Sequence, residues 1–68
     1  MKLSARNQLT GTVVGITPGA VNASVKVDIG NSQIITSSIT NEAVQDLALT
    51  PGDAVTVFVK STDVLIGK

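Results

Sequence analysis

Alternation of apolar and polar residues in the middle of the chain is the feature that most limits how it can fold. From residue 21 to residue 29, every odd-numbered position is apolar and every even-numbered position is polar. Successive side chains of a β-strand point to opposite faces, so this pattern predicts a strand with one buried face. Gly30 and Asn31 then suit a tight turn, and residues 34–40 again suit a strand. The two segments are therefore predicted to form a β-hairpin.

Three further segments suit strands because they are rich in β-branched or other apolar residues. They are residues 9–17, 54–60 and 64–66. The first of them contains Gly11 and Gly15, and glycine within a strand often marks a bulge or a sharp bend. We therefore expect this strand to curve as the strands of a small barrel do.

One short helix is expected over residues 40–47, between the third and fourth strands. Thr40 or Asn41 suits the N-cap, and Glu42 lies in the first turn, where the helix dipole favours an anion. A helix at this place in five strands is typical of the five-stranded Greek-key barrel called the OB-fold. We expect an all-β fold of this kind over residues 1–68, as a single domain. An SH3-like barrel is the alternative, but it gives no reason for a helix at this point.

The small size of the chain predicts assembly with other subunits. At 68 residues, folding removes only about 60% of the surface of the chain from water, so a monomer would be marginally stable. The chain is 43% hydrophobic, which is high for a protein with one aromatic residue. We therefore expect an oligomer in which apolar surface such as residues 64–66 is covered by a neighbouring subunit.

Composition also excludes several classes of function. The chain has zero net charge and a single aromatic residue, Phe58, which argues against nucleic-acid binding. Without histidine or cysteine, it has no histidine- or thiol-based catalysis and no ordinary zinc site. Its few carboxylates are scattered, so we expect no enzyme. It has neither a membrane-spanning run nor the apolar region of a signal peptide, so we expect a cytoplasmic protein with no membrane partner.

Hydrogen-bond donors gather near both ends of the chain. Ser4 and Arg6 are two residues apart, so in an extended segment they point to the same side. Lys60 and Ser61 place an ammonium group beside a hydroxyl group. Such groups suit an oxyanion, because the cations supply charge and the hydroxyls supply direction. The residues alone leave a second interpretation open, in which Arg6 and Lys60 are surface charges that protect a sheet edge from aggregation.

The chain also resembles a known family, the molbindins, which are small cytoplasmic proteins that bind molybdate and tungstate. The resemblance covers the whole chain and depends on residues 4–9, 11–14, 19–23, 39–40 and 60–62. It implies an OB-like barrel that exchanges its first strand between two subunits, with three such dimers forming a hexamer. It also implies that the ligand is molybdate or tungstate, bound as the intact oxyanion between subunits, with no directly coordinated metal and no other cofactor. The implied role is intracellular storage or homeostasis of molybdenum.

The resemblance assigns two sets of binding residues. The first set forms an intersubunit site and comprises Ser4, Arg6, Thr40, Lys60 and Ser61. The second set forms a site on the threefold axis and comprises Ala20 and Asn22. At Ala43 several members of the family have serine, so a donor is either missing here or replaced by a backbone amide at the start of the helix. Two alternatives to the family function stay open: an oligomerisation module without a ligand, and an OB barrel that binds oligonucleotides or oligosaccharides.

Overall fold

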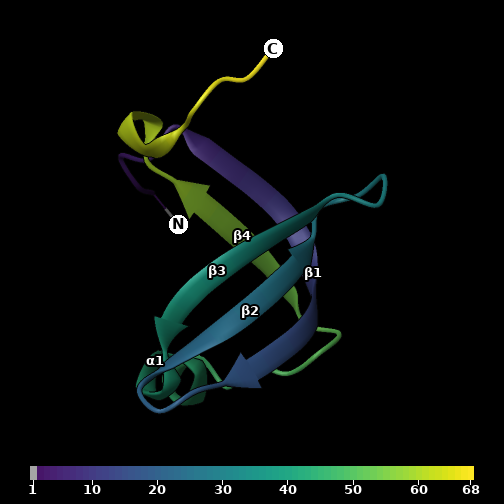
Figure 1. The fold of residues 1–68 in the computed structure, drawn as a ribbon, viewed down its shortest axis with the longest axis vertical. Coiled ribbons are helices and arrows are strands. Elements are labelled where there is room, and N and C mark those ends of the chain that lie inside the picture. Colours follow the sequence, from purple (N-terminus) through teal and green to yellow (C-terminus); the bar gives the residue numbers. More distant parts are fainter. Residues whose placement is uncertain (1) are drawn as a thin grey trace.

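The chain folds as a curled antiparallel sheet with a short helix at one end (Figure 1). The computed structural model describes residues 2–68, so Met1 of the expected domain lies outside the described residues. The described chain has four strands in the order β3-β2-β1-β4. These elements are β1 (Asn7–Pro18), β2 (Asn22–Asp28), β3 (Ile34–Thr40), helix α1 (Asn41–Asp46), β4 (Ala54–Val59) and a 3-10 helix η1 (Ser61–Asp63). The expectation of a mostly-β fold with one short helix between the third and fourth strands is confirmed.

Strand β1 belongs to two ladders. Its first half, residues 7–12, pairs with β4, and its second half, residues 12–18, pairs with β2. The register between β1 and β2 shifts between Val13 and Gly15, which is the irregularity that the glycines predict. Residues 7–12 belong to the first strand, which the resemblance implies is exchanged between subunits, and they pair here with β4 of their own chain.

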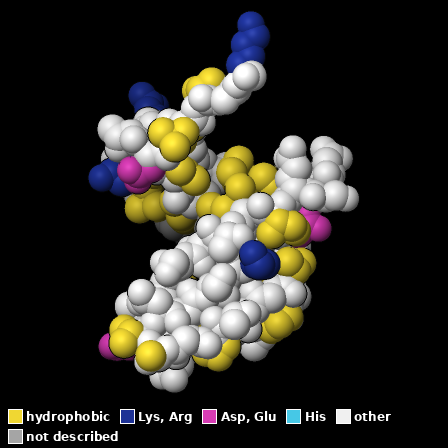
Figure 2. Space-filling view, viewed as in Figure 1, with side chains coloured by type: hydrophobic (Ala, Val, Ile, Leu, Met, Phe, Trp, Pro, Cys, Tyr) yellow, Lys and Arg dark blue, Asp and Glu magenta, His cyan; other side chains and the backbone are white. Residues whose placement is uncertain are grey.

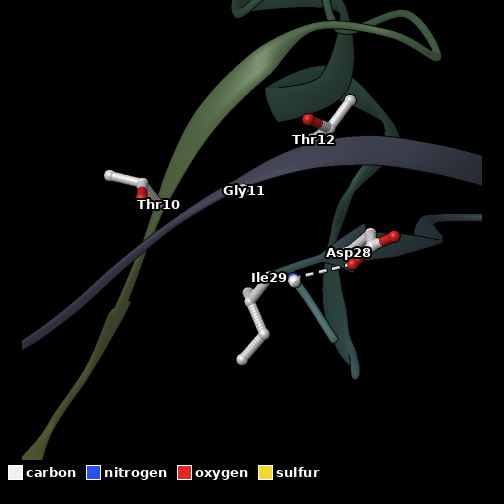
Figure 3. A pocket seen from close by; sticks show the side chains of 6 residues that line it. Thr10, Gly11, Thr12, Asp28 and Ile29 are labelled. Atoms are coloured by element: carbon white, nitrogen blue, oxygen red, sulfur yellow. Dashed lines mark hydrogen bonds between the residues drawn. The ribbon is translucent and has the colours of Figure 1, made fainter. Parts of the chain in front are cut away.

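Gly11 lies where β1 passes from one ladder to the other, and its backbone closely approaches β2 (Figure 3). A Cβ atom at this position would lie 2.5 Å from the backbone oxygen of Asp28 and 2.7 Å from Cγ1 of Val27. At Gly15, by contrast, a Cβ atom would meet nothing within 4 Å. Only at Gly11 does the curvature of the sheet therefore require the absence of a side chain.

The core is small and consists of aliphatic side chains. Val13, Val25 and Val27 are buried, and partly buried residues such as Ile39 and Val44 pack against them. Burial of one face of β2 agrees with the alternation in the sequence, since Ala23, Val25 and Val27 are its buried residues. The core lies inside the curl of the sheet, next to α1.

The hairpin between β2 and β3 has the tight turn expected from the sequence. Gly30, Asn31 and Ser32 have positive φ angles of 104°, 53° and 61°, which glycine and asparagine tolerate best. The N–H of Gly30 donates to Oδ1 of Asp28 at 2.8 Å, and the N–H of Gln33 donates to the Gly30 carbonyl oxygen at 3.0 Å. In Figure 1 this turn projects from the sheet, away from α1.

The structure differs from the sequence prediction at residues 64–66, which were expected to form a fifth strand. In the described chain these residues form no strand, and Leu65 and Ile66 are 92% and 91% exposed. The reason is the preceding turn of 3-10 helix, in which the N–H of Asp63 donates to the Lys60 carbonyl oxygen at 2.9 Å. This turn directs the chain away from the sheet before a further strand pairs with it (Figure 1).

A broad apolar groove opens on the inner face of the sheet. It has a volume of about 870 Å³, and its lining includes Val25, Ile39, Leu47, Val57 and Phe58. Figure 2 shows hydrophobic side chains in the notch between the upper and lower parts of the molecule. No helix among residues 2–68 has both the length and the apolar character required to cross a bilayer.

Candidate functional site

Four of the expected binding residues lie at one end of the β1–β4 ladder. The outermost pair of that ladder is Asn7 and Val59, and Nδ2 of Asn7 donates to the Val59 carbonyl oxygen at 3.3 Å. The segment that leads into Asn7 carries Ser4 and Arg6, and the segment that follows Val59 carries Lys60 and Ser61. We call these four the donor cluster: Ser4, Arg6, Lys60 and Ser61.

The donor cluster is open to solvent and carries two positive charges. All four side chains are exposed, and Ser61 begins η1. Arg6 and Lys60 supply the charges, and the serine hydroxyls supply further donors. Asp63, at the end of η1, is the carboxylate closest to the cluster along the chain. Cationic and hydroxyl donors on two adjacent segments suit a ligand that accepts hydrogen bonds on several sides.

Thr40, the fifth residue of the expected intersubunit site, lies elsewhere. It ends β3 and caps α1, at the other end of the molecule from η1 (Figure 1). Its Oγ1 accepts from the N–H of Ala43 at 3.0 Å, so the hydroxyl hydrogen is still available to a ligand. A single chain therefore brings together four of the five expected residues and separates the fifth from them.

The helix cap also involves Ala43, the position at which a serine donor is either missing or replaced by a backbone amide. The N–H of Ala43 is already bonded to Thr40. The Ala43 amide is therefore already occupied by the helix cap. Of the two residues that suited the N-cap, the structure selects Thr40 and places Asn41 in the first turn.

Ala20 and Asn22, the second expected set, lie in or next to the turn between β1 and β2. Both are exposed, and the N–H of Gly19 donates to the Asn22 carbonyl oxygen at 2.8 Å, which closes the turn. We call this segment the 19–22 turn. Asn22 is the register partner of Thr40 in the β2–β3 ladder. Asn22 of the second set is thus next to Thr40, a proximity that the sequence alone does not predict.

One other hollow in the described chain is visible in Figure 3 and has different chemistry. It is lined by Thr10, Gly11, Thr12, Asp28, Ile29 and Gly30. The Asp28 carboxylate, which bonds to Gly30, would repel an anion there. In residues 2–68 no three histidine, cysteine, aspartate or glutamate side chains gather as metal ligands would.

Comparison with known proteins places the chain in a family. Residues 3–66 match the TOBE domain. The chain belongs to the TOBE domain family. It is 45% identical to a probable molybdenum-pterin-binding protein of Haemophilus influenzae, over 98% of this chain and 97% of that protein. The sequence-based recognition of a molbindin-type TOBE domain is thereby confirmed.

Solved structures of molybdate-binding proteins have the same fold. A molybdate-binding protein from Sporomusa ovata superposes with a TM-score of 0.93 and 41% identity, over the full length of both chains. The cytoplasmic molybdate-binding protein ModG, in a form with molybdate bound, gives a TM-score of 0.85 and 48% identity. That match covers 90% of this chain and 43% of ModG. The curled sheet is therefore shared with these two molybdate-binding proteins, in ModG over the part that matches.

Proposed function

We propose that this protein binds molybdate, and also tungstate, as the intact oxyanion. The observation that carries the proposal is the donor cluster, in which Arg6 and Lys60 lie with two serines at one end of a ladder. It is supported by the similarity to proteins named for binding molybdate or molybdenum pterin. We expect no catalysis, and we propose that residues 1–68 act as one domain in the cytoplasm, in storage or homeostasis of molybdenum.

A site made only of donors favours molybdate over phosphate. Molybdate carries no proton at neutral pH, so each of its oxygens accepts hydrogen bonds. Hydrogen phosphate has a P–OH group that needs an acceptor, and leaving it unpaired costs about 1–3 kcal/mol. That cost corresponds to roughly 5- to 150-fold weaker binding, since about 1.4 kcal/mol is a factor of ten.

Separation of Thr40 from the donor cluster supports a site completed between subunits. We propose that exchange of the first strand places Ser4 and Arg6 of one subunit beside Lys60 and Ser61 of another, and that a Thr40 hydroxyl completes the site. The proposed assembly is a dimer with an exchanged first strand, and three dimers form a hexamer. In that assembly the apolar groove would be covered, and residues 64–66 would find the sheet edge that they lack in a single chain. Ala20 and Asn22 would form the site on the threefold axis.

Calorimetric titration with molybdate tests the role of the donor cluster. Arg6→Ala and Lys60→Ala should each weaken binding at least about tenfold, because loss of a hydrogen bond to a charged group costs about 1.5–3 kcal/mol. The matched control is Lys26→Ala, which removes the same charge from the outer face of β2, where Nζ donates to Oγ1 of Thr36 at 2.9 Å. Wild-type affinity in Arg6→Ala or Lys60→Ala would contradict the proposed site.

Light scattering after gel filtration tests the assembly. The expected mass is six times the 6.9 kDa of one chain. A folded monomer at micromolar concentration would exclude both the exchanged strand and the intersubunit site.

A further inference from the structure

Asn41 connects the start of α1 to the 19–22 turn through two hydrogen bonds. Its backbone N–H donates to the Val21 carbonyl oxygen at 2.8 Å. Its side-chain Nδ2 donates to the Gly19 carbonyl oxygen, also at 2.8 Å. These two acceptors lie on either side of Ala20, and the turn closes on itself through the bond from Gly19 to Asn22. One residue outside the 19–22 turn therefore contributes two of the hydrogen bonds that hold its conformation.

The other half of the Asn41 carboxamide has no partner. Oδ1 is buried and accepts no hydrogen bond from the described chain. A buried acceptor without a donor lowers the stability of a fold, so the Oδ1 half of the carboxamide gives no reason for an asparagine at this position. The role of the carboxamide therefore lies in its Nδ2 half, whose bond to the Gly19 carbonyl oxygen acts directly on the turn.

That effect concerns both sets of expected binding residues. The 19–22 turn carries Ala20 and leads into Asn22, and Asn41 directly follows Thr40. Asn22 and Thr40 are register partners, so Asn41 holds the backbone next to a residue of each set. A shift of the turn would move the Asn22 amide relative to a bound anion without changing any residue that contacts the anion.

We propose that Asn41 is a positioning residue for oxyanion binding, whose carboxamide holds the 19–22 turn in the geometry that binds the anion. The inference rests on the proposed function, because it concerns the second set of binding residues. Asn41 itself does not contact the ligand. Its contribution is to keep Ala20 and Asn22 in place through the bond to the Gly19 carbonyl oxygen.

The test compares molybdate titrations of the intact protein and four variants. Asn22→Ala identifies the class of sites that depends on the turn. Asn41→Leu keeps the size of the side chain and removes the bond to Gly19, and Asn41→Ser is the second variant in case leucine prevents folding. Val44→Ala is the control, because Val44 lies on the same helix and packs against the core without bonding to the turn.

Two classes of site are expected in the wild type. Asn41→Leu should weaken the class lost in Asn22→Ala at least tenfold, and the class that depends on Arg6 and Lys60 should change less than threefold. Val44→Ala should lower the melting temperature and leave both classes unchanged, which separates positioning from general destabilisation.

Each other outcome overturns the inference. Wild-type binding in both Asn41 variants would exclude a positioning role while leaving the proposed function in place. Equal losses in Asn41→Leu and Val44→Ala at equal melting temperature would reduce Asn41 to a contribution to stability. A wild-type protein with a single class of sites would exclude a separate site at the turn, and one that binds no molybdate would overturn the proposed function as well.

Discussion

Adding one methyl group at Gly11 should disrupt the sheet where β1 passes between its two ladders. In Gly11→Ala the new Cβ would lie 2.5 Å from the Asp28 backbone oxygen, whereas ordinary contacts begin at 3.4 Å. The strands must therefore separate by about 0.9 Å at this point, the difference between those two distances. Two of the three nearest atoms belong to the backbone of Asp28, so rotation of a side chain does not relieve the overlap.

The expected loss of stability follows from two opposing effects. Overpacking of this kind costs about 1–3 kcal/mol. Replacing glycine by alanine regains about 0.4–1 kcal/mol, because the unfolded chain loses conformational freedom. Taking the middle of each range, we therefore expect Gly11→Ala to lower the free energy of unfolding by about 1.3 kcal/mol, which corresponds to a fall of roughly 5–10 °C in melting temperature for a domain of this size.

Gly15→Ala is the matched control, in the same strand with the same added atom. Nothing lies within 4 Å of its Cβ position, and its φ is not positive. It should be neutral or raise the free energy of unfolding by about 0.4–1 kcal/mol. Urea and thermal unfolding of all three proteins at one protein concentration measure the difference, since oligomerisation makes stability depend on concentration. Equal stability of the two variants would refute the argument from the close approach at Gly11.

Three further predictions concern other parts of the chain. Ala48 has a φ of 50°, a left-handed conformation that strains any residue with a Cβ atom. Ala48→Gly should therefore raise the free energy of unfolding, measured by urea titration, by about 0.5–1 kcal/mol. A decrease would contradict the argument that Ala48 is strained. Thr40→Val should lower it by about 1 kcal/mol through loss of the N-cap, whereas Thr40→Ser should retain the cap, as unfolding followed by circular dichroism would record. Leu65 is 92% exposed in one chain, so Leu65→Asp should lower the mass of the assembly in light scattering; an unchanged mass would show that no subunit covers this residue.

Local patterns predicted those parts of the fold that depend on neighbouring residues in the sequence. The hairpin of β2 and β3 follows from alternation and from the turn at Gly30, and Thr40 was one of two expected caps. Residues 7 and 8 were not expected in a strand, because asparagine and glutamine have no preference for strands. They join β1 because their backbones pair with β4, and the local preferences of residues carry no information about such pairing. Residues 64–66 show the opposite error, because a strand was predicted where none forms. Apolar residues do not form a strand unless a neighbouring strand pairs with them.

The candidate site was predictable as a set of residues and not as an arrangement. The pattern of hydrogen-bond donors and then the resemblance both selected Ser4, Arg6, Lys60 and Ser61. The β1–β4 register explains why the two segments that carry them lie at one end of the sheet. The register of β2 against β3 places Asn22 opposite Thr40, and alternation alone does not determine register between strands. The bonds from Asn41 to the 19–22 turn join residues far apart in the sequence, so no local sequence pattern predicts them.

The projecting turn between β2 and β3 gives experimenters a place for chemical labelling. Since the chain contains no cysteine, Ser32→Cys would introduce a unique thiol at an exposed position. A fluorophore attached there would lie away from both the donor cluster and α1 (Figure 1). Energy transfer between labelled copies would then follow subunit exchange in real time, with and without added molybdate.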